Sequence, residues 1–380
     1  MNVDQCDAAE TEAWLTLLRA PGLGAAGLRS LVTRAGGAVA ALTDLERLRR
    51  EFSFGESTLA WLRAPDAARI TADLAWLAAD GRRLLTWDDA DYPALLREAA
   101  AAPAALFVSG EISLLWRPQV AIVGARSATA GGLANARSFA THLAAAGFVV
   151  TSGLADGVDG AAHAAALDAG GSTVAVMGTG PDLVYPRRHA GLAARIASAG
   201  ALVTEFPPGV EARPDHFPRR NRVIAGLSLG VLVVEAGTQS GSLITARLAA
   251  EQGREVFALP GSIHNPLARG CHRLIRQGAR LVETAVEIVD ELAPLAQALG
   301  ERLRERLAAP PQAAAAPAAS GSTRDADYVR VLAALGHDPI GLDELATRTG
   351  FGIPELSSML LLLELDGDVT SVGGGRYQRL

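Results

Sequence analysis

The middle of the chain carries short apolar runs separated by stretches with helical periodicity. Six such runs occupy residues 120–123, 148–151, 173–176, 201–204, 231–234 and 255–258. Strands that are apolar on both faces and alternate with helices are typical of a parallel sheet covered on both sides. The pattern therefore predicts an α/β fold whose core is a Rossmann-like parallel sheet. Ligands of such sheets bind beyond the carboxyl ends of the strands, so the residues after each run are the candidates for a site.

The residues before this core predict a separate helical domain over 1–82, rich in alanine and leucine. Within it, the glycine-rich stretch 21–28 joins two helical patterns in the manner of a helix-hairpin-helix or SAM-like segment. Backbone amides of such a turn can hold a DNA phosphate, but packing against a neighbouring domain is the favoured interpretation. The core domain is expected over 83–298, and it begins with a helix near 91–96 and an edge strand over 105–110.

Two further segments follow the core. Alanine, proline, serine and glycine dominate residues 299–324, which predicts a flexible linker. Residues 325–380 predict a winged-helix domain, with helices over 326–335, 342–347 and 353–365 and two short strands that flank the glycines 373–375. The third helix and its end carry three acidic residues and no arginine, which favours contact with protein or weak contact with DNA. These acidic residues are Glu355, Glu364 and Asp366.

The composition narrows the classes of function. The chain has 380 residues and a formal net charge of −6, which argues against a surface coated in positive charge for duplex DNA. Any nucleic-acid site must therefore be a local patch. All 35 cationic residues are arginine, because the sequence contains no lysine. Enzymes that need a Schiff-base lysine or a P-loop lysine are thereby excluded.

Nothing in the sequence indicates a membrane-spanning or secreted protein. No apolar run reaches the roughly 18 residues of a membrane span, and the first residues lack the basic start and apolar stretch of a signal peptide. The two cysteines, Cys6 and Cys271, form neither a disulfide framework nor a metal site. We expect a reduced, cytoplasmic protein without a bound metal.

The most unusual stretch is 216–222, where three arginines, an amide and an aromatic ring precede an apolar run. It predicts the first turn of a helix directed at an anion. Arginine forks bind phosphate, an asparagine amide bonds to sugar or base, and a phenylalanine ring offers a stacking surface. These features favour contact with single-stranded DNA over a solvated turn paired with internal carboxylates. The candidate residues are Phe217, Arg219, Arg220, Asn221 and Arg222.

Two other loops supply candidate phosphate contacts. Gly124 and Arg126 follow the first strand, where glycine allows close approach and a helix start would offer free amides. Ser240, Gly241 and Ser242 follow the fifth strand and predict a second anion cradle, in which one serine is expected to act as a plain N-cap. The dinucleotide fingerprint G-x-G-x-x-G does not follow the first strand, so neither NAD nor another cofactor is expected.

Catalysis is not expected at the remaining polar loops. Asp156, Asp159 and His163 follow the second strand and could suggest acid–base or metal chemistry. Helix capping by an aspartate, which also accepts loop amides, and a histidine–carboxylate bond explain them better. The loop 178–186 either walls a pocket or only connects two elements. Ser240 lies in no G-x-S-x-G elbow and has no histidine nearby in sequence, so no catalytic residue is assigned.

Together these motifs resemble the DNA-processing protein A (DprA/Smf) family. The marks are Gly124-x-Arg126, the segment 152–163, Phe217-Pro218-x-Arg220-Asn221-Arg222-x-Ile224-x-Gly226-Leu227-Ser228, Ser240-Gly241-Ser242-Leu243-x-Thr245-Ala246, Pro260-Gly261 and Gly270-Cys271-His272-x-Leu274-Ile275-x-x-Gly278-Ala279. The resemblance covers the whole Rossmann-like domain, and the flanking segments fit the longer members of the family.

The resemblance implies a homodimer that is not an enzyme, binds single-stranded DNA and loads the RecA recombinase during natural transformation. By the same resemblance, the strand-contacting positions are Arg126, Phe217, Arg220, Asn221 and Ser240 to Ser242. Family members often use lysine in this basic pocket. Arginine must serve here, which keeps the charge but changes its hydration and geometry.

The main alternative is a nucleotide-processing enzyme, because similar pockets occur in phosphoribohydrolases that cleave nucleoside monophosphates. Those enzymes carry P-G-G-x-G-T followed by a glutamate. The corresponding stretch here is Glu235-Ala236-Gly237-Thr238-Gln239, which lacks both the double glycine and the carboxylate after the threonine. A protein scaffold without a ligand is the third hypothesis.

Overall fold

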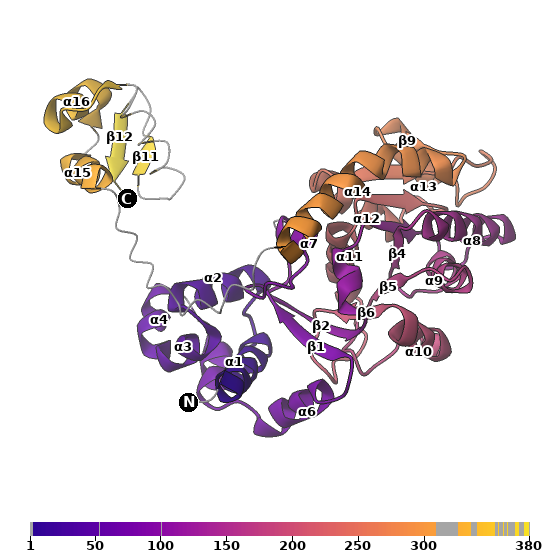
Figure 1. The fold of residues 1–380 in the computed structure, drawn as a ribbon, viewed down its shortest axis with the longest axis horizontal. Helices are drawn as coiled ribbons and strands as arrows, with labels where there is room; N and C mark the ends of the chain where they lie inside the picture. Colours follow the sequence, from indigo (N-terminus) through magenta and orange to yellow (C-terminus); the bar gives the residue numbers. More distant parts are fainter. Residues whose placement is uncertain are drawn as a thin grey trace. The chain divides into compact units, whose positions relative to one another are not determined.

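The computed structural model describes residues 3–52, 54–99, 101–308, 326–335, 340–353, 356, 360, 363, 369–371 and 376–379. The chain forms two compact units, Met1–Pro310 and Pro311–Leu380. The first unit holds both the helices that begin the chain and the large sheet (Figure 1). None of the described helices combines the length and the apolar character that crossing a membrane requires.

A sheet of nine strands, counted over the described residues, forms the centre of the first unit. The strands are β1 (Arg82–Thr86), β2 (Ala105–Gly110), β3 (Gln119–Val123), β4 (Val149–Ser152), β5 (Thr173–Val176), β6 (Ala201–Thr204), β7 (Gly230–Val233), β8 (Glu255–Ala258) and β9 (Arg280–Leu281). Their order is β1-β2-β6-β5-β4-β3-β7-β8-β9, and neighbours from β6 to β9 pair in parallel. The six predicted apolar runs form β3 to β8, which confirms the Rossmann-like prediction.

The strand order reverses direction at β3. Strands β4, β5 and β6 follow on one side of β3, whereas β7, β8 and β9 follow on the other. Loops that leave the carboxyl ends of β3 and β7 must therefore diverge to opposite sides, which opens a crevice between them. Ligands of open α/β sheets bind at such a switch point.

Two antiparallel strands extend the sheet beyond β6. β2 pairs with both β6 and β1, so the edge strand is β1. The expectation that residues 105–110 form an edge strand is therefore wrong. The sequence pattern does not predict β1, because its first two residues, Arg82 and Arg83, are exposed and the strand is only partly apolar.

Alternating side chains of the parallel strands build an apolar core on each face of the sheet. On one face, Ala121 and Val123 pack with α11 (His216–Leu227), α12 (Ser242–Glu251) and α13 (Arg269–Arg276). On the other face, Val120 and Ile122 pack with α8 (Ala130–Ala145), α9 (Val158–Asp168) and α14 (Ala285–Ala308). A smaller cluster joins α10 (Ala190–Ala199) to β5 and β6. This layering sets α11 and α12 side by side above the switch point.

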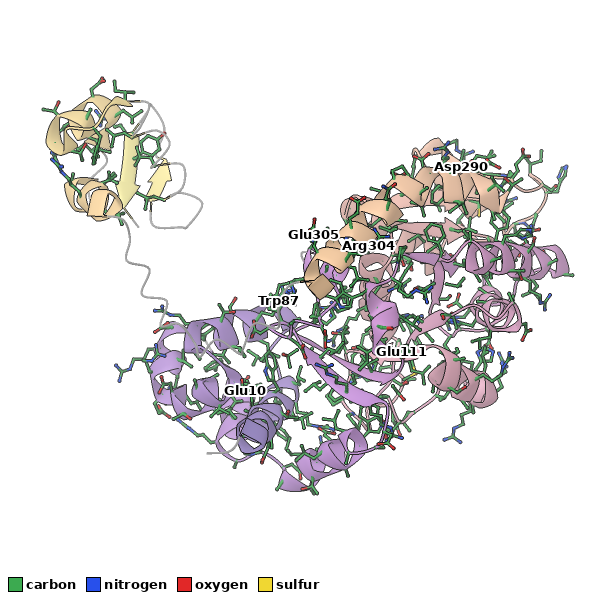
Figure 2. The ribbon with its side chains drawn as sticks, viewed as in Figure 1. Glu10, Trp87, Glu111, Asp290, Arg304 and Glu305 are labelled. Atoms are coloured by element: carbon green, nitrogen blue, oxygen red, sulfur yellow. The ribbon has the colours of Figure 1, made fainter. Side chains whose placement is uncertain are left out.

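The helices that begin the chain pack into a cluster of their own. They are α1 (Val3–Leu18), α2 (Ala25–Ala35), α3 (Ala38–Thr43), α4 (Leu45–Glu51), α5 (Glu56–Arg63) and α6 (Ala67–Leu77). The predicted glycine turn lies between α1 and α2, where Gly22 adopts a φ of 74° that favours glycine. Glu10 on α1 accepts bonds from the backbone amides of Ala38 (2.5 Å) and Val39 (3.1 Å), which holds the start of α3 (Figure 2).

This helical cluster is joined to the sheet by polar and aromatic contacts. The ring of Trp76 meets that of Phe107 on β2 edge to face, with 6.0 Å between centroids. The guanidinium of Arg29 on α2 lies 4.4 Å from the centre of the Trp87 ring, which follows β1 (Figure 2). Arg19 pairs with the buried Asp73 at 2.5 Å and donates to the carbonyl of Pro208 at 2.8 Å. These contacts agree with the packing role that the sequence favours for the cluster.

Short elements complete the path from the helical cluster to the core. α7 (Ala94–Arg97) confirms the helix predicted near 91–96, and two 3-10 turns lie at Ile112–Trp116 and Arg187–His189. α14 continues to Ala308, so the predicted linker is wrong for residues 299–308, which are helical. Leucines of this helix, including the buried Leu299, pack on the core and extend the helix past the expected boundary. The rest of the predicted linker lies outside the described residues.

The second unit contains the elements α15 (Ala326–Leu335), β10 (Ile340–Gly341), α16 (Leu342–Thr349), β11 (Val369–Ser371) and β12 (Arg376–Arg379). The strands form a small sheet in the order β10-β12-β11. The two predicted helices and the two strands around the glycines are confirmed. Most of the helix predicted over 353–365 lies outside the described residues, although Leu356, Leu360 and Leu363 are buried in the core of this unit.

Candidate nucleic-acid interface

A cavity of about 620 Å³ lies at the switch point between β3 and β7. We call it the arginine cavity. Loops after β3, β4, β5 and β7 and the first turns of α11 and α12 line it. Eight of the ten predicted site residues take part, namely Gly124, Arg126, Phe217, Arg220, Asn221, Ser240, Gly241 and Ser242. The strand order therefore brings together side chains that are more than a hundred residues apart in the sequence.

Arg220 forms the inner wall of the arginine cavity and is 5% exposed. Its Nη1 donates to the carbonyls of Gly153 and Val176 (2.7 Å), and its Nε donates to Oδ1 of Asn221 (3.1 Å). Burial lowers the pKa of Arg220 to about 10, an effect that Asp159 opposes and Arg126 increases. The guanidinium thus stays charged at neutral pH, and its Nη2 has no bonding partner among the described residues.

Arg126 forms the outer wall and is exposed. Its guanidinium lies 5.0 Å from the centre of the Phe217 ring, within the range of a cation–π contact. No carboxylate pairs with Arg126 in the described parts of the chain. The positive charges of Arg126 and Arg220 are close enough for the first to depress the pKa of the second, so an anion between them would relieve their repulsion.

Two aromatic rings stand at the mouth of the arginine cavity. Tyr185 is 50% exposed, and its ring centre lies 5.8 Å from that of Phe217 at an interplanar angle of 46°. The sequence left open whether the loop 178–186 walls a pocket, and the structure shows that it does. Tyr185 is therefore a site residue that the sequence analysis did not assign. The available signal in the sequence was an aromatic residue in a polar loop after a predicted strand.

The loop after β7 supplies polar groups to the opposite wall. The hydroxyls of Ser240 and Ser242 lie 2.7 Å apart, and the amide of Ser242 donates to Oγ of Ser240 at 3.4 Å. α12 begins at Ser242 with no side-chain cap from Gly241. The N-cap of α12 is therefore Gly241, and the expectation that one of the two serines caps this helix is wrong. The amides of Ser240, Leu243 and Ile244 donate to the carbonyls of Gly237, Ser240 and Gly241, at 3.1 Å each, so they are not free for an anion. The polar groups that this loop offers to the cavity are the hydroxyls of Ser240 and Ser242.

Asn221 lines the arginine cavity and also makes hydrogen bonds within the protein. Its Oδ1 accepts from Arg220 and its Nδ2 donates to the carbonyl of Gly241 at 3.3 Å. Each end of the amide thus makes one internal bond and keeps a second N–H or lone pair, so the expected bond to a sugar or base stays a prediction. Asn221 ties α11 to the loop before α12 and fixes the Arg220 guanidinium.

The loop after β3 also differs from expectation. α8 begins only at Ala130, where Thr129 caps it by accepting from the amide of Gly132 at 3.0 Å. Gly124 and Arg126 therefore lie in an extended loop and not at a helix start. A Cβ on Gly124 would lie 2.6 Å from Val158 Cγ2, so this glycine is required by packing against α9. Arg126 contributes charge without the help of helix amides.

Arg219 and Arg222 lie on another face of α11. Arg219 pairs with Oε2 of Glu205 at 3.1 Å, and Arg222 pairs with the same oxygen and also donates to the carbonyl of Ala101. They line a separate cavity of about 690 Å³, together with Gly22 to Gly27 of the glycine turn. The expectation that all three arginines converge on one cavity is therefore wrong, because residues two apart on a helix face different directions.

The polar residues after β4 have structural partners. Asp159 accepts from the amides of Gly153 (3.1 Å) and Ala155 (3.4 Å), as expected. The expected helix cap by an aspartate is wrong, because the N-cap of α9 is Gly157 and no side chain bonds there. Burial raises the pKa of Asp159, which Arg220 opposes. His163 is buried and bonds to Oγ1 of Thr173 (2.7 Å) and to the amide of Leu154 (3.3 Å). The expected bond from His163 to a carboxylate is thus wrong.

His163 and Asp156 are engaged in separate contacts within the protein. Burial lowers the pKa of His163 to about 3, so the ring is neutral at physiological pH. Asp156 pairs with Arg188 outside the arginine cavity. Within the described residues, no group of three histidine, cysteine or carboxylate side chains could hold a metal ion.

Glu235, the residue on which the enzyme hypothesis depends, lies outside the arginine cavity. One carboxylate oxygen accepts from the Thr129 amide (2.8 Å), and the other accepts from the Thr129 hydroxyl (2.7 Å) and from Asn265 (3.2 Å). The side chain is buried, and it fixes the start of α8. Both oxygens are occupied, and Glu235 does not line the cavity, where the lining carboxylate is Asp159.

Both units of the chain match models of known protein families, and the two models name the same kind of protein. The family of DNA recombination-mediator protein A matches residues 83–293, and the DprA winged helix domain matches residues 308–375. Protein Smf of Escherichia coli is 44% identical over 312 residues, which cover 82% of this chain and 81% of that protein. DNA processing protein DprA of Streptococcus pneumoniae is 46% identical over 200 residues, which cover 53% of this chain and 71% of that protein.

Solved structures show the same relationship. The X-ray structure of DNA processing protein A from Streptococcus pneumoniae superposes with a TM-score of 0.67 at 35% identity, covering 74% of this chain and 97% of that one. A structure that describes the single-stranded DNA binding mode of DNA processing protein A from Helicobacter pylori superposes with a TM-score of 0.50 at 28% identity, covering 53% and 93%. With its parallel sheet, its arginine cavity and its winged-helix unit, the chain belongs to the DNA-processing protein A (DprA/Smf) family.

Proposed function

We propose that this protein binds single-stranded DNA in the arginine cavity. The observation that carries the proposal is the pairing of Arg126 and Arg220 in one cavity with a single lining carboxylate, Asp159. Two guanidinium groups against one carboxylate leave a net positive charge that attracts a phosphate, and the hydroxyls of Ser240 and Ser242 add hydrogen-bonding groups. Tyr185 and Phe217 at the mouth offer stacking surfaces for bases, which only an unpaired strand exposes.

The finer role follows from the family. The matched family is a recombination mediator, and its Helicobacter pylori member binds single-stranded DNA. We therefore propose that this protein is not an enzyme and acts in the cytoplasm as a homodimer. In this role it protects incoming single strands and loads the RecA recombinase during natural transformation. A RecA strand-exchange assay with and without this protein, on strands covered by single-strand-binding protein, tests the loading step.

The direct test of the cavity is a titration of fluorescent oligo-dT with the wild-type protein and two variants. Arg126→Gln removes one exposed guanidinium that makes no ion pair, so the fold should persist. We expect about tenfold weaker binding, since a charge-assisted contact contributes about 1.5–3 kcal/mol. Arg137→Gln on α8 is the matched control, because this arginine is also exposed but lies outside the cavity.

The outcomes separate the proposal from nonspecific attraction. Equal affinity of Arg126→Gln and wild type would show that the arginine cavity does not bind the oligonucleotide. An equal loss in both variants would indicate binding by overall charge. A blunt duplex competitor should displace the oligonucleotide poorly, and binding should weaken as salt rises. Base release from AMP that depends on Glu235 would instead support the enzyme hypothesis.

A further inference from the structure

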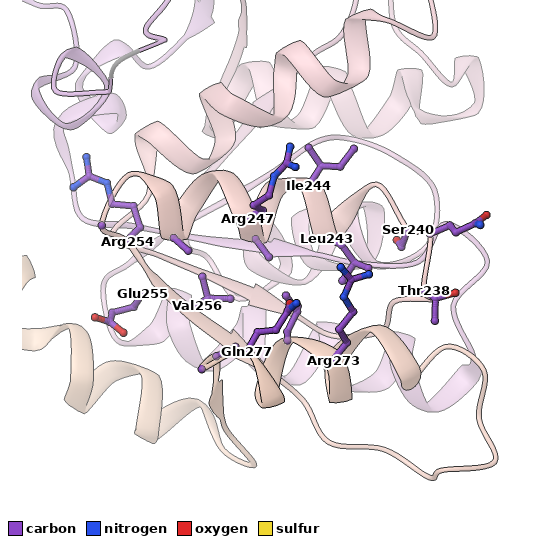
Figure 3. A pocket seen from close by; sticks show the side chains of 17 residues that line it. Thr238, Ser240, Leu243, Ile244, Arg247, Arg254, Glu255, Val256, Arg273 and Gln277 are labelled. Carbon is purple, nitrogen blue, oxygen red and sulfur yellow. The ribbon is translucent and has the colours of Figure 1, made fainter.

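Arg220 is held by groups of a different kind from those that hold other arginines nearby. Arg247 lines a neighbouring cavity of about 820 Å³, where it extends from α12 (Figure 3), and it pairs with the carboxylate of Glu251 at 3.5 Å. Arg220 instead donates from Nη1 to the backbone carbonyls of Gly153 and Val176. A carbonyl is neutral, so it fixes the guanidinium without cancelling its charge. The direction of these carbonyls therefore decides where the positive charge lies.

The carbonyl of Gly153 and the amide of Leu154 belong to one peptide unit, and His163 holds the other side of that unit. Nε2 of His163 accepts from the Leu154 amide at 3.3 Å. This peptide bond is trans, so its N–H and its C=O point in opposite directions across a rigid plane. An amide that is fixed at His163 therefore directs the carbonyl towards Arg220.

The backbone of Leu154 needs such support, because it is strained. Its φ of 57° lies in the left-handed region, which a leucine rarely adopts. Besides the bond to His163, its carbonyl accepts from Nδ1 of His189 at 2.9 Å, and its side chain is 1% exposed in the apolar cluster beside α10. Strained residues persist only where their surroundings impose the conformation, and they gather at functional sites. The two histidines are part of what imposes it here.

His163 is committed to one tautomer by its second partner. Nδ1 lies 2.7 Å from Oγ1 of Thr173, and the Thr173 hydroxyl donates its single proton to the carbonyl of Val150 at 2.5 Å. The Thr173 oxygen must then accept from Nδ1, which leaves Nε2 without a proton as the acceptor for Leu154. Burial lowers the pKa of His163 to about 3, so the ring keeps this neutral form at physiological pH.

We infer that His163 is a positioning residue for the DNA phosphate, although it does not line the arginine cavity. This inference rests on the function proposed above. Donors run in one direction along a chain from Arg220 through the peptide unit 153–154, His163 and Thr173 to the carbonyl of Val150. Each bond polarises the next, which strengthens the chain. Strands β4 and β5 thereby fix the guanidinium at the place where a phosphate enters.

Two amide variants separate the roles of the two nitrogens of His163. The side-chain nitrogen of asparagine lies where Nδ1 lies, so His163→Asn keeps a donor for Thr173 but loses the acceptor for Leu154. Oligo-dT affinity should fall about tenfold and its log–log salt slope by about one, because a displaced Arg220 loses its phosphate contact. The longer amide of His163→Gln reaches Leu154, so this variant should bind within about threefold of the wild type.

Gln119→Leu is the matched control for a general loss of stability. Gln119 is also buried in the sheet and makes two side-chain hydrogen bonds, but it does not line the arginine cavity. Its substitution should leave the salt slope unchanged, since poorer folding lowers the bound fraction at every salt concentration. The inference is overturned if His163→Asn keeps the wild-type slope or if His163→Gln loses as much affinity as His163→Asn. An equal fall of the slope in Gln119→Leu also overturns it.

A measurement on the wild-type protein does not depend on how the variants fold. Nitrogen-15 NMR of the imidazole should show His163 as the neutral tautomer with its proton on Nδ1 between about pH 5 and 8. A ring that titrates in this range, or one with its proton on Nε2, overturns the inference. If the wild type binds no oligo-dT, the proposed function fails together with this inference. If the wild type binds and His163→Asn has the same affinity and slope, the inference fails alone.

Discussion

The two faces of α11 carry arginines of one short sequence stretch, but only one face keeps its charge available. Arg220 and the nearby Arg126 face a cavity with one lining carboxylate, Asp159. Arg219 and Arg222 share one oxygen of Glu205, which is 6% exposed. A count of arginines therefore says little about where an anion binds. The balance between cations and carboxylates on each face decides it.

The electrostatic contrast has a geometric origin. Residues three apart on a helix are neighbours, so Arg219 and Arg222 can reach a common partner, while Arg220 between them faces elsewhere. Asp159 is itself committed to two loop amides, and burial raises its pKa. It is therefore a weaker counterion for Arg220 than Glu205 is for its pair. The face with the weaker counterion is the better site for a phosphate.

The largest expected effect comes from displacing Arg220 without removing its charge. A Cβ on Gly153 would overlap the Arg220 guanidinium, so Gly153→Ala should push this group out of its carbonyl bonds. We expect oligo-dT affinity to fall about a hundredfold, because the inner phosphate contact and its alignment are both lost. Titration of fluorescent oligo-dT, with circular dichroism to monitor folding, measures the change.

The matched control for this variant is Gly191→Ala at the start of α10. A Cβ at that glycine meets no atom within 4 Å, so affinity should stay within twofold of wild type. A folded Gly153→Ala protein with wild-type affinity would show that Arg220 is only a structural residue. The contrast between the two faces of α11 would then lose its functional meaning.

On the opposite face, removing the carboxylate should affect stability more than binding. Glu205→Gln leaves Arg222 largely buried beside a neutral partner, which should lower the free energy of unfolding by about 3 kcal/mol. Oligo-dT affinity should change less than twofold, since neither arginine lines the arginine cavity. Urea unfolding and DNA titration of the same preparation measure both quantities. Glu211→Gln, at an exposed position in the same loop, is the control.

Much of the fold could be predicted because short apolar runs in the sequence correspond to its strands. Six apolar runs form six parallel strands, since strands buried on both faces are mostly apolar. Their few polar residues, such as Thr151 and Thr173, are buried and hydrogen-bonded. β1 could not be found in this way, because an edge strand with exposed arginines has no such run. The length of α14 was also missed, because alanine and proline content suggests a linker although the helix continues to Ala308.

The site was predictable in its residues but not in its grouping. The motif residues were found from their chemistry, and the switch point between β3 and β7 explains why most of them meet. Helical spacing alone could have separated Arg219 and Arg222 from Arg220. The role of Glu205 could not be predicted, because its proximity to α11 depends on the loop after β6. Nor could the sequence show that Asn221 makes a hydrogen bond within the protein at each end of its amide.

A pH titration of DNA affinity tests the role of the Arg220 charge, and we expect a smaller effect than for the substitution that displaces this side chain. Burial lowers the pKa of Arg220 to about 10, so its charge is present below that value and is lost as the pH rises through it. Binding should be constant to about pH 9 and roughly threefold weaker near pH 10.5. Oligo-dA is the probe, because its bases do not lose a proton in this range.

Unfolding caused by the titration of Arg220 does not explain such a loss, because this titration makes the fold more stable as the pH rises. The folded state releases this proton at a lower pH than the unfolded state does, so the unfolded state binds more protons between the two pKa values. The contribution of Arg220 to stability therefore rises with pH in that window. Circular dichroism at each pH checks that the fold persists. Affinity that is flat to pH 11 would contradict a role for the Arg220 charge.

The smallest expected effect belongs to Arg219, the immediate neighbour of Arg220. Arg219 is 53% exposed, pairs with Glu205 at 3.1 Å and lies 4.9 Å from the centre of the Phe206 ring, while Arg222 keeps the same carboxylate occupied without it. Arg219→Gln should therefore change the free energy of unfolding by less than about 1 kcal/mol and oligo-dT affinity by less than about twofold. The measurement is a titration beside Arg126→Gln at one salt concentration. A loss as large as that of Arg126→Gln would mean that DNA covers both faces of α11. In that case DNA would contact Arg219 although Glu205 neutralises its charge. The balance of cations and carboxylates would then not explain which face of α11 binds DNA.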